Sequence, residues 1–250
     1  MKARLSHTLL SACLFTSVVV AAEKVESHTW EVGDIPIVKV DTYRGDLFVE
    51  PSDSGRVELI VTASSSDAEA EDWLNDIRVK TTPFGAGLVI SVVNTRTDLE
   101  SGLDEISSRS VELRLLVPRV ANLDIRASEG SIEIGDNFEG QMRARLDRGN
   151  VIIGRTKGSV IARTEVGNIS IGGTTGNLTA STRSGNLVVG TVLGWAQLRS
   201  DRGGIEITHT GNGFELAAEA GGGDVQPSPV RRAVKDFVSV NEVPAIRFEG

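Results

Sequence analysis

Hydrophobic and polar residues alternate through the second half of the chain in a pattern that returns every eighteen residues. Gly149-Asn-Val-Ile-Ile-Gly154 recurs as Gly167-Asn-Ile-Ser-Ile-Gly172 and again as Gly185-Asn-Leu-Val-Val-Gly190. Each repeat holds two short segments with an apolar residue at every second position, which is typical of strands with one buried face. Because such a short strand cannot bury its apolar face alone, the repeat predicts units stacked against one another.

This stacking predicts an all-β fold in which two parallel sheets face each other across an aliphatic core. The expected architecture is a parallel β-solenoid with one coil for every eighteen residues. The winding preference of parallel strands favours a right-handed coil. The alternation assigns aliphatic residues of the repeat to the interior, among them Val151, Ile153, Val160, Ala162, Ile169, Ile171, Leu178, Ala180, Leu187 and Val189.

The section before the repeat has a different pattern. Runs of β-branched and other apolar residues predict strands at 35–40, 47–49, 57–61, 88–93 and 111–117. Ser66-Asp-Ala-Glu69 is similar to a capping box, and the apolar residues of 70–77 fall on one helical face, which predicts a single short helix. Polar residues 94–108 predict a loop. We interpret this section as a cap on the open end of the repeat, because unpaired sheet edges favour aggregation.

The N-terminal residues predict export. Lys2 and Arg4 precede an apolar run that extends to Val20, and Val20-Ala-Ala22 fits a signal-peptidase site. Leu10-Ser-Ala-Cys13 also fits a lipobox, so a lipid anchor at Cys13 is the alternative to cleavage after Ala22. No other stretch approaches the length of a membrane span. The protein is therefore expected in the periplasm, in the outer envelope or outside the cell.

These features divide the chain into four parts: a signal peptide (1–22), a strand-rich N-terminal section or cap (23–118), the solenoid repeats (119–226) and a C-terminal cap or tail (227–250). We expect residues 23–250 to form one continuous body, because the caps and the repeats must share a core. Cleavage would remove the only cysteine, so the mature chain would form no disulfide.

The net charge limits the classes of partner that the protein is expected to bind. The formal net charge of −8 becomes −10 when Lys2 and Arg4 are removed with the signal peptide. An acidic, exported chain is a poor partner for nucleic acid or for anionic lipid headgroups. The histidines have no spacing typical of a metal site, and the glycine-rich stretches lack the lysine of a phosphate-binding loop. We therefore predict no metal and no cofactor.

The strongest hint of catalysis is a pair of carboxylates one coil apart, Asp147 and Glu165. Their expected separation is near that of a retaining glycosidase pair. The column of Arg145, Arg163 and Arg199 beside them argues against this role, because a catalytic acid needs an apolar pocket that raises its pKa. Alternating charges of this kind are typical of a solvated sheet face. We predict that the protein is not an enzyme.

Two further features concern binding and stability. Trp195 follows Gly194 at an outward position, where an indole can stack on a sugar or anchor a partner. We therefore consider a binding surface made by Trp195, the three arginines and the two carboxylates. Asn150, Asn168 and Asn186 occupy equivalent corners and predict a ladder of side-chain amides along the stack.

One form of corner and strand recurs in Arg44-Gly-Asp-Leu-Phe-Val49, Arg148-Gly-Asn-Val-Ile-Ile153, Val166-Gly-Asn-Ile-Ser-Ile171 and Ser184-Gly-Asn-Leu-Val-Val189. In this form the chain is similar to the bacterial "putative adhesin" β-solenoid family. The resemblance implies a non-enzymatic, adhesin-like binding or structural protein of the surface or envelope, with a protein or polysaccharide partner. A periplasmic module that binds a membrane protein is the alternative, and a glycan-active enzyme is a remote one. Arg44-Gly-Asp46 has the form of an integrin-binding tripeptide, but the parallel with Arg148-Gly-Asn150 predicts a corner.

Overall fold

The structure is a computed structural model that describes residues 22–66, 70–94, 109–211, 214–219, 225–227 and 238–241. The predicted signal peptide through Ala21, including Cys13, lies outside the described residues. So do almost all of the polar loop and most of the C-terminal tail.

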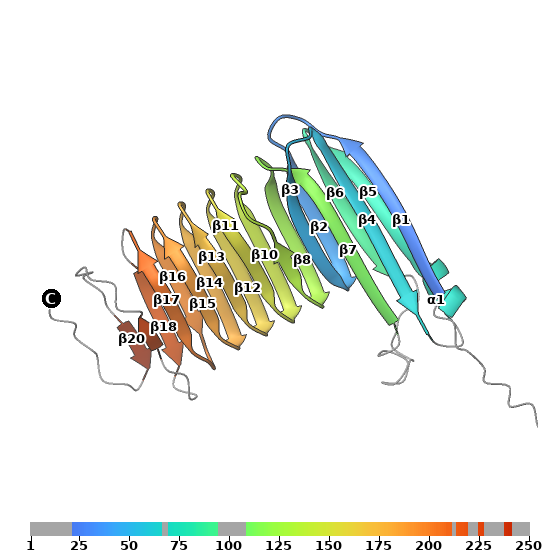
Figure 1. Cartoon of the computed structure of the whole chain (residues 1–250). Helices are drawn as coiled ribbons and strands as arrows, with labels where there is room; N and C mark the ends of the chain where they lie inside the picture. The colour runs from blue at the N-terminus through green and yellow to red at the C-terminus, as the bar shows by residue number, and fades with distance from the viewer. Residues whose placement is uncertain are drawn as a thin grey trace, which may run out of the picture.

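Two ten-stranded sheets, which we call A and B, face each other along the length of the molecule (Figure 1). In spatial order, sheet A contains β1 (Ala22–Glu31), β4 (Arg56–Ser65), β7 (Arg109–Pro118), β3 (Asp46–Ser52), β9 (Ile132–Ile134), β11 (Val151–Thr156), β13 (Ile169–Thr174), β15 (Leu187–Val192), β17 (Ile205–Thr210) and β19 (Val225–Pro227). Sheet B contains β20 (Val238–Asn241), β18 (Phe214–Glu219), β16 (Ala196–Ser200), β14 (Leu178–Ser184), β12 (Val160–Val166), β10 (Met142–Arg148), β8 (Asn122–Glu129), β2 (Ile37–Arg44), β6 (Gly87–Asn94) and β5 (Ile77–Phe84). One helix, α1 (Ala70–Asp76), contacts β1, β4 and β5.

The all-β class and the single short helix are confirmed across the described residues, but the prediction of a parallel β-solenoid is wrong. Both sheets are mixed. β4 pairs antiparallel with β1 and β7 in sheet A, and β5 pairs antiparallel with β6 in sheet B. The physical reason is local: β5 and β6 are joined only by Gly85 and Ala86, and a two-residue hairpin forces its strands to be antiparallel.

Four strands were missing from the sequence prediction, and all four form sheet edges. They are β1 and β19 in sheet A, and β5 and β20 in sheet B. β1 has no apolar alternation, because its half-buried positions include Lys24, Glu26 and His28. β5 contains Pro83, which an edge strand tolerates because one side of its backbone has no partner strand. Edge strands depend less on burial, so their patterns were too weak to identify.

The alternation within the repeat does set which side chains are buried. Val151 pairs with Ile169, Ile169 with Leu187, and Leu187 with Ile205, always eighteen residues apart, and all four are buried. Sheet B has the same interval. Threonine and serine hydroxyls at the core's edge donate to corner carbonyls, such as Thr182 Oγ1 to the Gly167 oxygen at 2.9 Å. The core is therefore aliphatic at its centre and polar only where the backbone needs partners.

One repeat is a residue longer than the others. Partners in β8 and β10 are nineteen residues apart, as are those in β9 and β11. Farther along the same segment, Phe138 bridges Thr156 at the ordinary interval of eighteen. The extra residue therefore lies between Ile134 and Phe138, where Asn137 has a φ of 69°. Asparagine tolerates this left-handed conformation better than most residues, so the insertion is absorbed at a corner.

Candidate functional site

The outer face of sheet B brings together most of the site residues predicted from the sequence. Neighbouring parallel strands lie about 4.8 Å apart, so residues at equivalent positions form rows that cross the strands. We call one of them the arginine row. From β2 to β16 it contains Asp41, Arg126, Arg145, Arg163, Ser181 and Arg199.

The strand alternation points this row toward solvent. Ala144 and Leu146 flank Arg145 and are buried in the core, as is Ala162 beside Arg163. The paired residues on either side also define a second outward row, two residues farther along each strand. This second row contains Tyr43, Ser128, Asp147, Glu165, Arg183 and Asp201. The two rows together make a ribbon of charged and hydroxyl groups across six strands.

The two predicted catalytic carboxylates lie in the second row but are not equivalent. Glu165 Oε2 is 2.8 Å from a guanidinium nitrogen of Arg183. Asp147 borders a hollow together with Arg145. The corresponding Asp201 is 2.7 Å from Nε of Arg199. These contacts are ion pairs on an exposed face, which is the arrangement expected of charge balance. They do not supply the apolar pocket that a catalytic acid requires.

Two hollows indent this face. The larger, about 450 Å³, lies over the ends of β2, β6, β8 and β10 and is bordered by Asp41, Tyr43, Arg126, Arg145 and Asp147 among others. The smaller, about 370 Å³, is bordered by Arg163, Thr179, Ser181, Gln197 and Arg199. Both contain members of the arginine row. The small side chain of Ser181 leaves the gap between Arg163 and Arg199.

Trp195 lies just before β16, at one margin of the same face. Its exposed fraction is 40%, the value expected of a half-covered indole. Its backbone N–H donates to Asn177 Oδ1 at 3.0 Å, and its carbonyl accepts from Leu178. Position 195 belongs to a third row, four residues before that of Arg199.

The three predicted corner asparagines form a chain of hydrogen bonds. Asn150 Oδ1 accepts from the backbone and the side-chain N–H of Asn168, at 3.0 and 3.3 Å. Asn168 Oδ1 accepts from the Asn186 backbone, and Asn186 Oδ1 from the Gly204 backbone. The dominant contact is therefore from side chain to backbone. All three side chains are exposed.

Asp46 plays the same role toward Ser131 at an earlier corner. Asp46 Oδ1 accepts from the backbone and the hydroxyl of Ser131, at 2.8 and 2.7 Å. Gly45 has a φ of 128°, and Arg44 is 3.7 Å from Glu129. The Arg44-Gly-Asp46 tripeptide is therefore a corner whose aspartate is engaged within the fold.

Sequence reasoning missed several residues of this face, among them Arg126 and Tyr43. Arg126 stands nineteen residues before Arg145. The extra residue between Gly135 and Gly140 is visible in the sequence and accounts for this interval, so the alignment that sets the buried residues of this unit also sets Arg126. Tyr43 is 56% exposed, and no pattern marked it because β2 belongs to the section without repeats.

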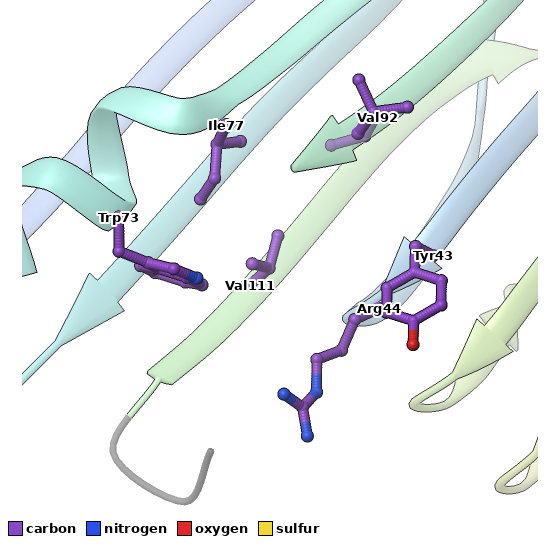
Figure 2. Close-up of a pocket in the computed structure, with 7 residues that line it drawn as sticks. Tyr43, Arg44, Trp73, Ile77, Val92 and Val111 are labelled. Carbon is purple, nitrogen blue, oxygen red and sulfur yellow. The ribbon is translucent and has the colours of Figure 1, made fainter. Parts of the chain in front are cut away.

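A separate apolar pocket lies at the N-terminal end, beneath α1. Figure 2 shows Trp73 and Ile77 approaching it from α1 and the start of β5, with Val111 on β7 and Tyr43 and Arg44 at the end of β2. Trp73 is buried, and its Nε1–H has no hydrogen-bond partner among the described residues. The cavity volume of about 30 Å³ is room for a water molecule and too little for an organic ligand.

The inner side of edge strand β1 is polar. Lys24 Nζ is 2.8 Å from Glu26 and donates to the carbonyl oxygen of Leu74 in α1. The hydrogen bond from Lys24 holds the pKa of Glu26 below its ordinary value of 4.5, against a smaller opposing effect of burial. The rings of His28 and Trp30 stack with centroids 5.6 Å apart. Charges pointing inward on an edge strand oppose pairing with a second molecule.

Within the described residues, no group of three or more histidine, cysteine, aspartate or glutamate side chains is arranged to hold a metal ion. The described part of the chain also contains no helix with the length and apolar content needed to span a bilayer.

No protein-family model matches the sequence, and no curated protein is significantly similar to it. Solved structures show a weak likeness. A "putative adhesin" of Bacteroides fragilis is 13% identical, with a TM-score of 0.40, over 82% of this chain and 91% of that one. A "putative cell adhesion protein" of Clostridium sporogenes is 14% identical, with a TM-score of 0.34, over 79% and 99%.

A "putative lipid binding protein" of Parabacteroides distasonis is 13% identical, with a TM-score of 0.30, over 86% of this chain and 95% of that one. Adhesin names thus recur among the similar structures. Likeness at this level carries no argument.

Proposed function

We propose that the protein is an exported, non-enzymatic binding protein of the cell surface or envelope, and that its binding site is the outer face of sheet B. One observation carries the proposal: this face presents the arginine row with a hollow at each end of the Arg145–Arg163 pair. Charged and hydroxyl side chains held at fixed intervals on a rigid sheet suit recognition of an extended ligand.

Three further observations support the non-enzymatic part of the proposal. The Glu165 carboxylate is occupied by Arg183, and Asp201 by Arg199. The apolar pocket at Trp73 is too small for a substrate. Both hollows carry arginines, whereas a catalytic acid for glycan cleavage needs an apolar pocket that raises its pKa. Export is supported by the basic and apolar N-terminal pattern of residues 1–22.

The test blocks one face of the molecule at a time. The chain's only cysteine is Cys13, so a protein starting at Glu23 accepts a single engineered thiol. Ser181→Cys lies on the outer face of sheet B, and Ser170→Cys on the outer face of sheet A. Each variant is coupled to a polyethylene glycol maleimide. Each protein also carries a fluorescent label. Its binding to cell envelopes of the source organism is then measured by pull-down over a series of protein concentrations.

We expect coupling at Ser181→Cys to abolish binding and coupling at Ser170→Cys to leave it unchanged. The uncoupled variants should both bind like the parent. Equal binding by the two coupled proteins would exclude this face as the site. Loss of binding only with the Ser170→Cys conjugate would move the site to sheet A.

A further inference from the structure

We propose that the arginine row binds a linear polysaccharide that carries carboxylate groups, with Arg145 and Arg163 as the principal contacts. The inference rests on the proposed function and specifies the ligand of the same face. It starts from an arrangement that is unfavourable without a ligand.

Three arginines stand in register on adjacent strands. Arg126 pairs with Arg145, and Arg145 pairs with Arg163. Like charges directly opposite each other destabilise a sheet, and here the repulsion is repeated across three strands. A surface selected only for charge balance would alternate its signs. The uninterrupted run of positive charge indicates that an anion contributes to this face.

The chain's own carboxylates neutralise the ends of the row and leave its middle open. Arg126 lies 3.9 Å from Asp124 and pairs in register with Asp41. Arg199 is bound to Asp201 at 2.7 Å. Glu165, the carboxylate nearest in sequence to Arg163, is turned to Arg183. Among the described residues, Arg145 and Arg163 form no ion pair of their own.

The geometry favours carboxylates borne on a sugar chain. A guanidinium presents parallel N–H donors that match a carboxylate in a bidentate manner. Arg145 and Arg163 lie about 4.8 Å apart across the strands, an interval that a linear chain of acidic sugars can follow. Hydroxyl groups of such a chain would find acceptors and donors in Asp147 and Thr179, which border the two hollows.

The surroundings disfavour other anions. A membrane would require a continuous apolar surface beside the arginines. The exposed apolar side chains of sheet B stand singly, with Tyr43 (56% exposed) on β2, Val166 (52%) on β12 and Trp195 (40%) before β16. Nucleic acid has a high density of charge, and the chain carries a net charge of −8 with carboxylates in the neighbouring row. A polysaccharide with about one charge per sugar would be repelled less.

The experiment measures binding of the chain from Glu23 to polygalacturonate by biolayer interferometry. Neutral dextran, dextran sulfate and phosphatidylglycerol vesicles are the comparison ligands. We expect binding to polygalacturonate that weakens with salt, because exposed charges are screened. Arg145→Ser together with Arg163→Ser should weaken it by about a hundredfold, at about tenfold for each lost charge-assisted contact.

The matched control is Arg56→Ser together with Arg155→Ser, which removes the same charge from exposed positions of sheet A. We expect it to change binding by less than about twofold, the effect of net charge alone. Equal loss in both double variants would overturn the site. So would retention of binding by the Arg145→Ser, Arg163→Ser protein.

Equal or stronger binding to the sulfate polymer or to the vesicles would overturn the ligand class. The proposed function is judged separately by the conjugates at Ser181→Cys and Ser170→Cys. If face blocking abolishes envelope binding but polygalacturonate does not bind, the carboxylated ligand is wrong and the binding face is retained. If face blocking has no effect, the proposed function itself is wrong.

Discussion

At the scale of the residue, alternation along a strand decides which side chains meet the core and which meet solvent. It placed Arg145, Arg163 and Arg199 outside and the aliphatic residues between them inside. It could not identify every neighbour in the row, since these depend on pairing. Arg126 follows from the nineteen-residue step, but Asp41 joins the row through a strand outside the repeat. Side-chain contacts such as Glu165 with Arg183 also follow from rotamers rather than from spacing.

The corner asparagines give a stability prediction at this scale. Asn168→Leu removes the acceptor for the Asn186 backbone N–H, 2.9 Å away, and the side-chain bond to Asn150. Because the corner is exposed, water replaces part of the loss. We expect a decrease of about 0.5–1.5 kcal/mol in the free energy of unfolding, measured by urea denaturation. Asn168→Asp keeps the acceptor and serves as the control. An equal decrease in both variants would show that the hydrogen bond to the backbone is not the cause.

The lowered pKa of Glu26 predicts that the stability of the fold depends on pH. This pKa is lower in the folded protein than its ordinary value of 4.5, so ionisation favours folding. This contribution is fully present above pH 4.5 and is lost as the pH falls through the lower, folded-state pKa. Glu26→Gln should therefore reduce stability at pH 6 and lessen the loss of stability on acidification below pH 4.5. Thermal unfolding followed from pH 6 to pH 3 measures both effects.

The control for Glu26 is Glu23→Gln, which makes the same charge change on the other side of β1. Its unfolding should follow the parent's pH dependence. The pairing with Lys24 would be dismissed as the cause if Glu26→Gln and the parent lost stability in parallel.

At the scale of the element, backbone conformation at the corners is as decisive as the strands. The repeat predicted the central strands well because each is bounded by glycine and has two or three buried positions. It failed at the N-terminal end, where β1 and β5 have polar half-buried positions and hairpin geometry sets the direction. Glycine spacing therefore marks the corners of the repeat but carries no information on strands that return antiparallel.

Gly167 tests the role of the corner. Its φ is +144°, and a Cβ there would collide with the carbonyl oxygen of Gly149 in the preceding repeat. We expect Gly167→Ala to reduce the free energy of unfolding by about 2–4 kcal/mol, from backbone strain and displacement of the neighbouring corner. Chemical denaturation of the purified variant measures the change. Gly55→Ala is the control, because a Cβ there meets no atom within 4 Å. A loss below about 0.5 kcal/mol at Gly167, in the range of ordinary surface changes, would contradict the steric argument.

At the scale of the whole molecule, the N-terminal strands and the repeats share both sheets. β3 pairs with β9 in sheet A and β2 pairs with β8 in sheet B, so in both sheets the strands before residue 118 continue directly into those after it (Figure 1). The buried side chains form a single cluster from Val38 to Ile207. A continuous core of this kind leads us to expect cooperative unfolding, which is the behaviour of one body.

The three tryptophans allow a direct test. Trp73 lies in α1, and Trp195 lies before β16 near the other end. Two single-tryptophan proteins, one carrying Trp30→Phe and Trp195→Phe and the other Trp30→Phe and Trp73→Phe, report from these places. Fluorescence and circular dichroism should give coincident urea midpoints within each protein. Separate transitions at the two reporters would show that the N-terminal section and the repeats unfold independently.

The equal interval in the two sheets has a consequence for how this protein can change in length. An insertion or deletion of eighteen residues in the repeat preserves the register of sheets A and B together, so binding positions are added or removed as whole strands. Any other length change must be confined to a corner, as the single extra residue at Asn137 is. A duplicated unit carrying the equivalent of Arg163 would lengthen the positive row by one step. The length of ligand that this face contacts therefore changes by whole steps when repeats are gained or lost.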